Sequence, residues 1–319
     1  GTVKIAVGTH ALFSDDVEFQ NLGLVIVDEQ HRFGVAQRLA LKSKGRDVHQ
    51  LMMSATPIPR TLAMSFFADL DVSVIDELPP GRTPIKTRLV NNIRRAEVEG
   101  FVLNICRKGQ QAYWVCPLIE ESETLQLQTA TETLEQLQAA LPELNIGLVH
   151  GRMKAAEKAE VMAQFAAGRL NVLVATTVIE VGVDVPNAAL MVIEHAERMG
   201  LAQLHQLRGR VGRGAAESVC VLLFAEPLSE LAKARLKVIY EHTDGFEIAH
   251  QDLNIRGPGE FLGARQSGVP MLRFANLEED LHLLEQAREI APMLIEQNPE
   301  IVEAHLARWL SSREGYLGV

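Results

Sequence analysis

Two arginines with glycines around them form the first cluster of residues that could do chemistry. The run Gln206-Leu-Arg-Gly-Arg-Val-Gly-Arg213 places Arg210 and Arg213 three residues apart. On a helix, residues i and i+3 share a face, so we expect both guanidinium groups to reach one target. Each planar guanidinium can bind two oxygens at once, which suits a phosphate chain. A basic helix face turned to solvent is the alternative from these residues alone.

A second cluster is acidic. Asp28-Glu29-Gln30-His31 follows residues 22–27, an apolar run that predicts a buried parallel strand. Ligands of α/β sheets bind beyond the carboxyl ends of such strands. Asp28 could hold Mg²⁺ there, and Glu29 could orient or deprotonate an attacking water.

Hydroxyl groups follow two further predicted strands. A Ser-Ala-Thr string begins at Ser54 after residues 50–53, and a string from Thr176 to Asp184 follows residues 171–174. Each four-residue string is weak evidence by itself. Their order and spacing along one chain are strong evidence that the strings belong to one functional site.

The strings Asp-Glu-Gln-His, Ser-Ala-Thr, Thr-x5-Gly-x-Asp and Gln-x-x-Gly-Arg-x-Gly-Arg follow one another in the chain. In this order they resemble the motor core of superfamily 2 helicases. The longer strings over residues 28–38 and 54–61 are similar to those of bacterial RecG-type ATP-dependent DNA helicases. The resemblance covers essentially the whole chain.

The resemblance implies a role for each string. The catalytic group would be Asp28, Glu29, Gln30, His31, Arg210 and Arg213, with Asp28 as the ligand of the metal. The nucleotide-binding group would be Gly182, Asp184 and Gln206. The DNA-binding group would be Thr9, His150, Gly151 and Thr176. The group that couples hydrolysis to movement would be Ser54, Ala55, Thr56, Arg256, Arg265 and Gln266. For Thr9, a glycine turn with a capping threonine is the alternative from the residues alone.

No Gly-x-x-x-x-Gly-Lys-Ser/Thr phosphate loop occurs in the sequence. The resemblance therefore implies the carboxyl-terminal portion of a larger motor, without the phosphate loop and the upstream wedge domain. ATP and Mg²⁺ are the cofactors expected in the intact protein. We expect the isolated chain to be inactive, because nothing in it can cradle the β- and γ-phosphates.

The elements that must position these residues alternate between strands and helices, which predicts an α/β fold with RecA-like parallel sheets flanked by helices. Residues 1–80 would be the remainder of a first motor lobe, with a strand over residues 3–7. A Pro- and Gly-rich linker, 81–87, would lead to a complete second lobe, 88–227. Its expected parts are strands at 111–116, 145–149, 171–175, 188–193 and 218–224, a polar connection at 120–131, and a helix at 155–167.

The pattern changes after the second lobe. Residues 228–268 would form a helical hairpin and a glycine-rich loop that begins at Leu253, similar to the element with which RecG-type proteins and the transcription-repair translocase move along duplex DNA. A loop that only joins the tail to the lobe is the alternative. Residues 269–319 would be a helical extension that packs on the missing amino-terminal part of the protein.

Composition narrows the class. The 319 residues carry a net charge of −10, which argues against a uniformly basic nucleic-acid binder but not against a motor with local phosphate contacts. No apolar run reaches the ~20 residues of a membrane span. Three cysteines without metal-type spacing indicate buried thiols in a reducing cytoplasm. A monomeric, cytoplasmic motor without a membrane role is expected.

Three functions remain open. The favoured one is an ATP-dependent double-stranded DNA translocase that remodels branched DNA, such as forks and Holliday junctions, in recombination and in repair of DNA damage. The second is a transcription-repair coupling translocase, against which stands Gln30, where an acidic residue is expected. The third is a non-catalytic DNA-docking fragment, which the missing phosphate loop favours for the isolated chain.

Overall fold

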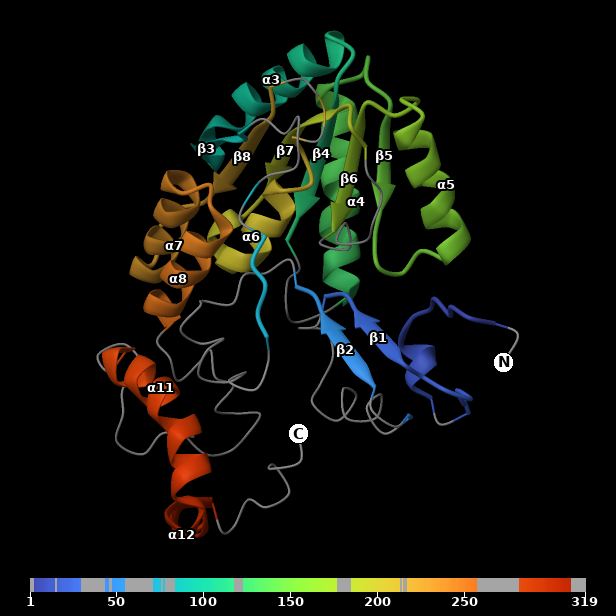
Figure 1. Ribbon diagram of the computed structural model, residues 1–319. Helices are drawn as coiled ribbons and strands as arrows, with labels where there is room; N and C mark the ends of the chain where they lie inside the picture. The colour runs from blue at the N-terminus through green and yellow to red at the C-terminus, as the bar shows by residue number, and fades with distance from the viewer. Residues whose placement is uncertain are drawn as a thin grey trace. The chain divides into compact units, whose positions relative to one another are not determined.

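The computed structural model describes twelve ranges of the chain (Figure 1): 3–14, 16–29, 44–45, 48–54, 71–75, 77, 84–117, 123–176, 185–212, 214, 217–256 and 281–310. The chain divides into two compact units. The smaller unit comprises Gly1–Ala68 and Leu272–Val319, and the larger comprises Asp69–Met271.

The smaller unit holds a short parallel sheet. Strands β1 (Leu24–Val27) and β2 (His49–Met52) pair in parallel, which confirms both predicted strands. The strand predicted over residues 3–7 is wrong, because this segment pairs with no strand among the described residues. Its apolar side chains are instead 75 to 93% exposed, so they gain nothing from a sheet. The unit also contains a 3-10 turn, η1 (His10–Phe13), and two helices, α11 (Leu281–Gln297) and α12 (Pro299–Leu310).

The larger unit is built on a six-stranded parallel sheet of order β3-β8-β7-β4-β6-β5. Its strands are β3 (Lys86–Asn91), β4 (Gln111–Cys116), β5 (Ile146–Val149), β6 (Val172–Thr176), β7 (Ala188–Ile193) and β8 (Val219–Phe224). Its helices are η3 (Asn92–Arg94), α3 (Arg95–Arg107), α4 (Glu123–Ala140), α5 (Ala155–Ala166), η5 (Ala196–Arg198), α6 (Leu201–Arg208), α7 (Glu230–Glu241) and α8 (Gly245–Arg256).

Both faces of this sheet are covered, as strand β4 shows. Every residue of β4 is buried, and its side chains alternate between two clusters. Tyr113 and Val115 pack with side chains of α5, α6 and α7, whereas Trp114 packs with side chains of α3 and α4. An apolar run buried on both faces is what a parallel sheet between two helical layers requires. The predicted RecA-like α/β class is thereby confirmed.

The polar connection predicted over residues 120–131 is wrong from Glu123 onward, where the structure has helix α4. The run looks polar because few of the described side chains of α4 are buried. Ala130, Leu137 and Leu141 are buried at helical spacing, while most positions between them face solvent.

Carboxyl ends of parallel strands meet at one edge of a sheet, and this edge is therefore where side chains for chemistry can gather. Val149↔Ala175 is the last aligned pair of β5 and β6, so His150 and Thr176 follow side by side. Glu194 follows β7 at the same edge. Within the described ranges, no helix combines the length and apolar character needed to cross a membrane.

All three cysteines are buried and free. Burial raises the pKa of Cys106 to about 11 and those of Cys116 and Cys220 to about 12. In the part of the chain that the structure describes, no group of three or more His, Cys, Asp or Glu side chains could hold a metal ion. The cysteines therefore act as small apolar residues of the core.

These thiols should resist alkylation in the folded chain. Only the thiolate reacts, and both burial and a raised pKa keep it scarce at pH 8. We expect iodoacetamide to modify the three cysteines only after urea unfolds the chain, as followed by mass spectrometry. An Ala163→Cys variant, with its thiol on the exposed side of α5, is the positive control. Labelling of a native cysteine at the rate of this control would contradict the buried assignment.

Candidate functional site

The acidic cluster begins at the end of strand β1. Val27 is buried, Asp28 is exposed, and Glu29 is half-buried. Glu29 has φ 52°, a left-handed conformation that is uncommon for residues other than glycine, and its N–H donates to Asp28 Oδ1 at 2.8 Å. Such local strain is frequent at functional sites. The structure thus places two adjacent carboxyl side chains at the sheet edge, while Gln30 and His31 lie outside the described residues.

Strand β2 ends beside the acidic cluster. The N–H of Met53 donates to the carbonyl of Val27 at 2.8 Å, so the two strands finish together. Ser54 follows directly and is exposed. Ala55 and Thr56 lie outside the described residues. The structure therefore brings the start of the predicted coupling string to the carboxyl end of the sheet that carries Asp28.

The arginine run does not form one helical face. Helix α6 ends at Arg208, with Gly209 as its C-cap, before either predicted arginine finger. Gly212 then has φ 84°, which side chains rarely adopt and which turns the chain away from a helical course. The expectation that Arg210 and Arg213 share a helix face is wrong for this reason. Arg210 is half-buried in the turn, and Arg213 lies outside the described residues.

Gly214 brings the end of this turn against another predicted site string. A Cβ atom at Gly214 would collide with the carbonyl oxygen of Pro186, so only glycine allows the approach. Pro186 comes two residues after Asp184, and Gly182 and Asp184 themselves lie outside the described residues. Gln206 is half-buried on α6. The arginine run and the segment after Asp184 therefore meet in space.

Arg208 was missed by the sequence analysis, although it is the most buried charge of the run, at 3% exposure. Its Nη1 donates to the carbonyls of Ile239 and His242 at 2.8 and 2.9 Å and to Thr87 Oγ1 at 3.3 Å. Its Nη2 donates to the carbonyl of Thr243 at 3.3 Å. A signal was present in the sequence, because the buried leucines Leu201, Leu204 and Leu207 put position 208 on the inner side of α6.

His205 completes the surroundings of this guanidinium. Its Nδ1 lies 3.0 Å from Arg208 Nη2. Burial, together with the charge of Arg208, lowers the pKa of His205 to about 4, against the opposing effect of Asp244. The imidazole is therefore neutral at pH 7, so Nδ1 can accept a hydrogen bond from Arg208.

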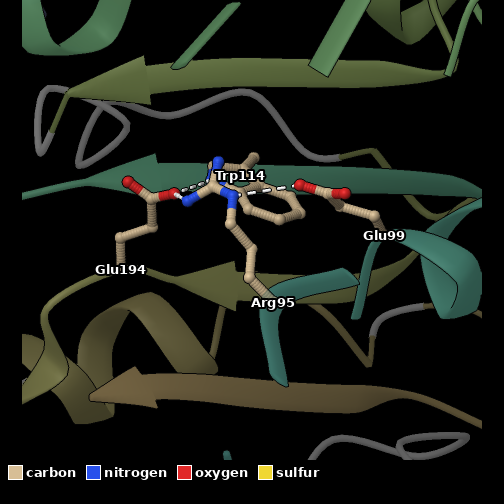
Figure 2. Close-up of polar contacts among 4 residues, drawn as sticks. All are labelled: Arg95, Glu99, Trp114 and Glu194. Atoms are coloured by element: carbon tan, nitrogen blue, oxygen red, sulfur yellow. Dashed lines mark hydrogen bonds and ion pairs between the residues drawn. The ribbon is translucent and has the colours of Figure 1, made fainter. Parts of the chain in front are cut away.

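A half-buried arginine, Arg95, fixes the carboxyl end of β7 (Figure 2). Arg95 Nη1 and Trp114 Nε1 both donate to Glu194 Oε1, the indole at 2.9 Å. Arg95 Nε also donates to Glu99 Oε1 at 3.0 Å, and the guanidinium stacks 4.9 Å from the centre of the Trp114 ring. Glu194 is only 5% exposed. The first turn of α3 is thereby held to the end of β7 by a charge-assisted pair.

Hydrogen bonds from α7 hold the connection between β7 and α6. His195 has φ 47°, and its Nδ1 lies 3.2 Å from Glu197 Oε1. Arg235 on α7 donates through Nη1 to the carbonyl of Met199 at 3.0 Å and through Nη2 to that of Glu197 at 3.1 Å. Helix α6 therefore starts and ends at points that are hydrogen-bonded to α7.

The edge formed by β5 and β6 suits a polyanion. Thr176 is 2% exposed, and among the described residues neither Thr176 Oγ1 nor His150 Nδ1 has a hydrogen-bond partner. Buried polar atoms are normally paired, so two orphans side by side suit a ligand. Burial lowers the pKa of His150, and the cations Lys158 and Arg152 lower it further. Gly151 is exposed, and its carbonyl accepts from Lys158 Nζ at 2.8 Å.

Thr9 stands just before η1 and is exposed. Its side chain makes no capping hydrogen bond, which removes the capping alternative and leaves the hydroxyl for another role.

The hairpin predicted after the second lobe is confirmed as α7 and α8. The loop expected from Leu253 is wrong as far as Arg256, because α8 continues to that residue. The reason is burial: Asp252 and Leu253 are 4 and 7% exposed, and Ile255 packs against the core. Arg256 is thus the last residue of a helix, and Arg265 and Gln266 lie outside the described residues.

Comparison with known proteins also identifies helicase segments where the helicase-like strings lie. Three family models match: DEAD/DEAH box helicase over residues 1–65, helicase conserved C-terminal domain over 97–215, and ATP-dependent DNA helicase RecG, domain 3, C-terminal, over 242–310. The ATP-dependent DNA helicases RecG of Acidithiobacillus ferridurans and of Escherichia coli (strain K12) are each 58% identical over 99% of the chain. The chain spans 46% of the length of each of these relatives.

A solved structure of RecG bound to a three-way DNA junction is also similar. It matches with a TM-score of 0.67 and 50% identity, over 89% of this chain and 36% of that one.

The state of His205 predicts how stability depends on pH. An unfolded histidine titrates near 6.5 and the folded one near about 4, so the unfolded chain binds more protons between these values. The contribution of His205 to the free energy of unfolding is therefore fully present above the unfolded pKa. It falls as the pH drops toward 4, by about 3 kcal/mol. Urea unfolding at pH 4.5 and pH 7 measures the loss.

A His205→Asn variant provides the matched control, because an amide keeps an acceptor near the position of Nδ1 but does not titrate. We expect the variant to lose less stability on acidification than the wild-type chain. An identical loss in both proteins would show that His205 is not the responsible group.

Proposed function

Because the chain belongs to the family of RecG-type ATP-dependent DNA helicases, we propose that it is the carboxyl-terminal part of a motor that uses ATP to move on double-stranded DNA. The motor would remodel branched DNA, such as stalled forks and Holliday junctions, in recombination and repair. The observation that carries this proposal is the adjacent, strained pair Asp28 and Glu29 at the carboxyl end of β1, where α/β proteins bind ligands.

The two carboxylates of the acidic pair would have different roles in ATP hydrolysis. Asp28, exposed at the strand end, would be a ligand of Mg²⁺, a metal that takes few protein carboxylates and completes its shell with phosphate oxygens and water. When bound, Mg²⁺ neutralises charge on the phosphates. Glu29 would orient the attacking water and accept its proton. Gln30 and His31 would complete the string in the nucleotide site.

The arginine turn would act on the phosphates of the nucleotide. Arg210 and Arg213 would stabilise the charge that develops on the transferred phosphoryl group, in the manner of arginine fingers. Gln206, Gly182 and Asp184 would bind nucleotide beside them. The close contact of Gly214 with Pro186 supports this grouping, because it brings the two strings together.

Four residues would contact DNA: Thr9, His150, Gly151 and Thr176. Thr176 and His150 offer buried polar atoms without a partner among the described residues, and Arg152 and Lys158 add positive charge beside them. A lowered pKa keeps His150 neutral at pH 7, so it would bind a phosphate oxygen or a sugar through a hydrogen bond and not as a cation.

Coupling of hydrolysis to movement would involve Ser54, Ala55 and Thr56 in the smaller unit and Arg256, Arg265 and Gln266 after the hairpin. We also propose the boundaries given by the sequence: motor lobes at 1–80 and 88–227 around the linker 81–87, the hairpin and loop at 228–268, and a tail at 269–319. The tail would pack on the upstream part of the protein. Ile290, Met293 and Leu294 of α11 are 39 to 51% exposed, which supports such a contact.

Variants of the acidic pair and of the arginine turn test the proposal in a protein of the relatives' full length. Glu29→Gln should retain ATP binding but lose most turnover on a three-way junction, because it removes the base and keeps the metal ligand. Arg210→Ala should lower kcat by a factor of ~10³. Glu18→Gln, an exposed acid of the same unit as Glu29, is the matched control and should keep wild-type turnover.

The isolated 319-residue chain is a second control. It should bind nucleotide weakly and show negligible turnover, since it lacks a phosphate loop. Wild-type ATPase activity in the Glu29→Gln or the Arg210→Ala protein would refute the assigned roles.

A further inference from the structure

The guanidinium of Arg208 is a buried cation surrounded by uncharged acceptors. Of its five contacts, three are backbone carbonyls, one is a hydroxyl and one is an imidazole nitrogen. A buried charge is tolerated only when hydrogen bonds replace its hydration. The contacts of Arg208 are therefore a condition of folding for the end of α6.

The carbonyls come from one place, the carboxyl end of helix α7. Ile239 lies in its last turn, His242 is its C-cap, and Thr243 follows. The last carbonyls of a helix lack partners within the helix and carry its negative partial charge. Arg208 thus caps α7 from another element, with two of the bonds at 2.8 and 2.9 Å.

Backbone hydrogen bonds join the turn that follows Arg208 to helix α6. The N–H of Gly209 donates to His205 O and that of Arg210 to Leu207 O, both at 3.0 Å, and that of Val211 to Arg208 O at 3.4 Å. All three bonds point back into the last turn of α6. The end of α6 is therefore one anchor of residues 209–212, and Arg208 holds that end to α7.

We propose that Arg208 is a positioning residue for Arg210. By capping α7, it makes the turn 209–212 and the α7–α8 hairpin one rigid unit, so that the hairpin and Arg210 move together. The catalytic part of this inference rests on the proposed function of Arg210, whereas the mechanical link rests on the contacts of Arg208 alone.

Hydrogen exchange of backbone amides in the 319-residue chain tests the mechanical link. In Arg208→Gln, amides of residues 209–212 and 242–246 should both exchange at least about tenfold faster, while those of β4 and β7 keep their rates. Arg208→Lys should give a smaller change, because an ammonium keeps the charge but not the fork that reaches several carbonyls. Thr87→Val, which removes a single acceptor, serves if Arg208→Gln does not fold.

Leu236→Ala is the matched control for loss of stability. Leu236 is a core residue of α7, 2% exposed, and has no contact with the guanidinium among those described above. This variant should loosen α7 without selectively releasing residues 209–212. The proposal is overturned if the turn keeps its protection in Arg208→Gln, or if Leu236→Ala produces the same paired release.

Kinetics in a protein of the relatives' full length test the positioning role. Arg208→Gln should lower the kcat of the DNA-stimulated ATPase about tenfold or more and leave the KM for ATP within about twofold, at a temperature at which it remains folded. Leu236→Ala should keep both values. An unchanged kcat, or equal losses in both variants, would overturn the positioning role. Retained turnover in Arg210→Ala would instead refute the proposed function, while the exchange result would still decide on the link.

Discussion

A guanidinium withdrawn from water must be given acceptors, and this constraint governs the arrangement of the larger unit. Arg95 meets it with two carboxylates and a stacked indole, and so joins the start of α3 to the end of β7. Arg208 meets it with carbonyls from the end of α7, and so joins α6 to the hairpin. The strands supply many of the buried apolar residues, and these two charges tie α3 and α6 to the elements beside them.

The sheet of the larger unit was predictable because its buried strands appear as apolar runs in the sequence. Residues 111–116 form an apolar run, and the predicted strand coincides with β4. The predictions failed where the deciding factor is tertiary. Residues 3–7 alternate like a strand but pair with no described neighbour, and α4 reads as polar because few of its described side chains are buried. A local pattern cannot say whether a pairing partner or a buried stripe exists.

The residues of the candidate site also fall into those that the sequence located and one that it missed. The structure has Asp28, Glu29, His150 and Thr176 at the ends of strands, as predicted, because strand ends can be located from sequence, while their roles stay predictions. Arg208 was missed because a charged side chain is expected to be exposed unless its partners are known. Its three carbonyl partners come from residues 31 to 35 positions further along the chain, at the end of a different helix.

The central claim is that the buried guanidinium of Arg208 is held by the carbonyls at the carboxyl end of α7. Nitrogen-15 NMR of the arginine side chains in the 319-residue chain tests it most directly, with Arg208→Gln to assign the signals. The account predicts separate Nη proton signals for Arg208 that exchange slowly with water, because its hydrogen bonds hinder rotation of the guanidinium. A single averaged Nη signal with the exchange rate of a solvated arginine would contradict it.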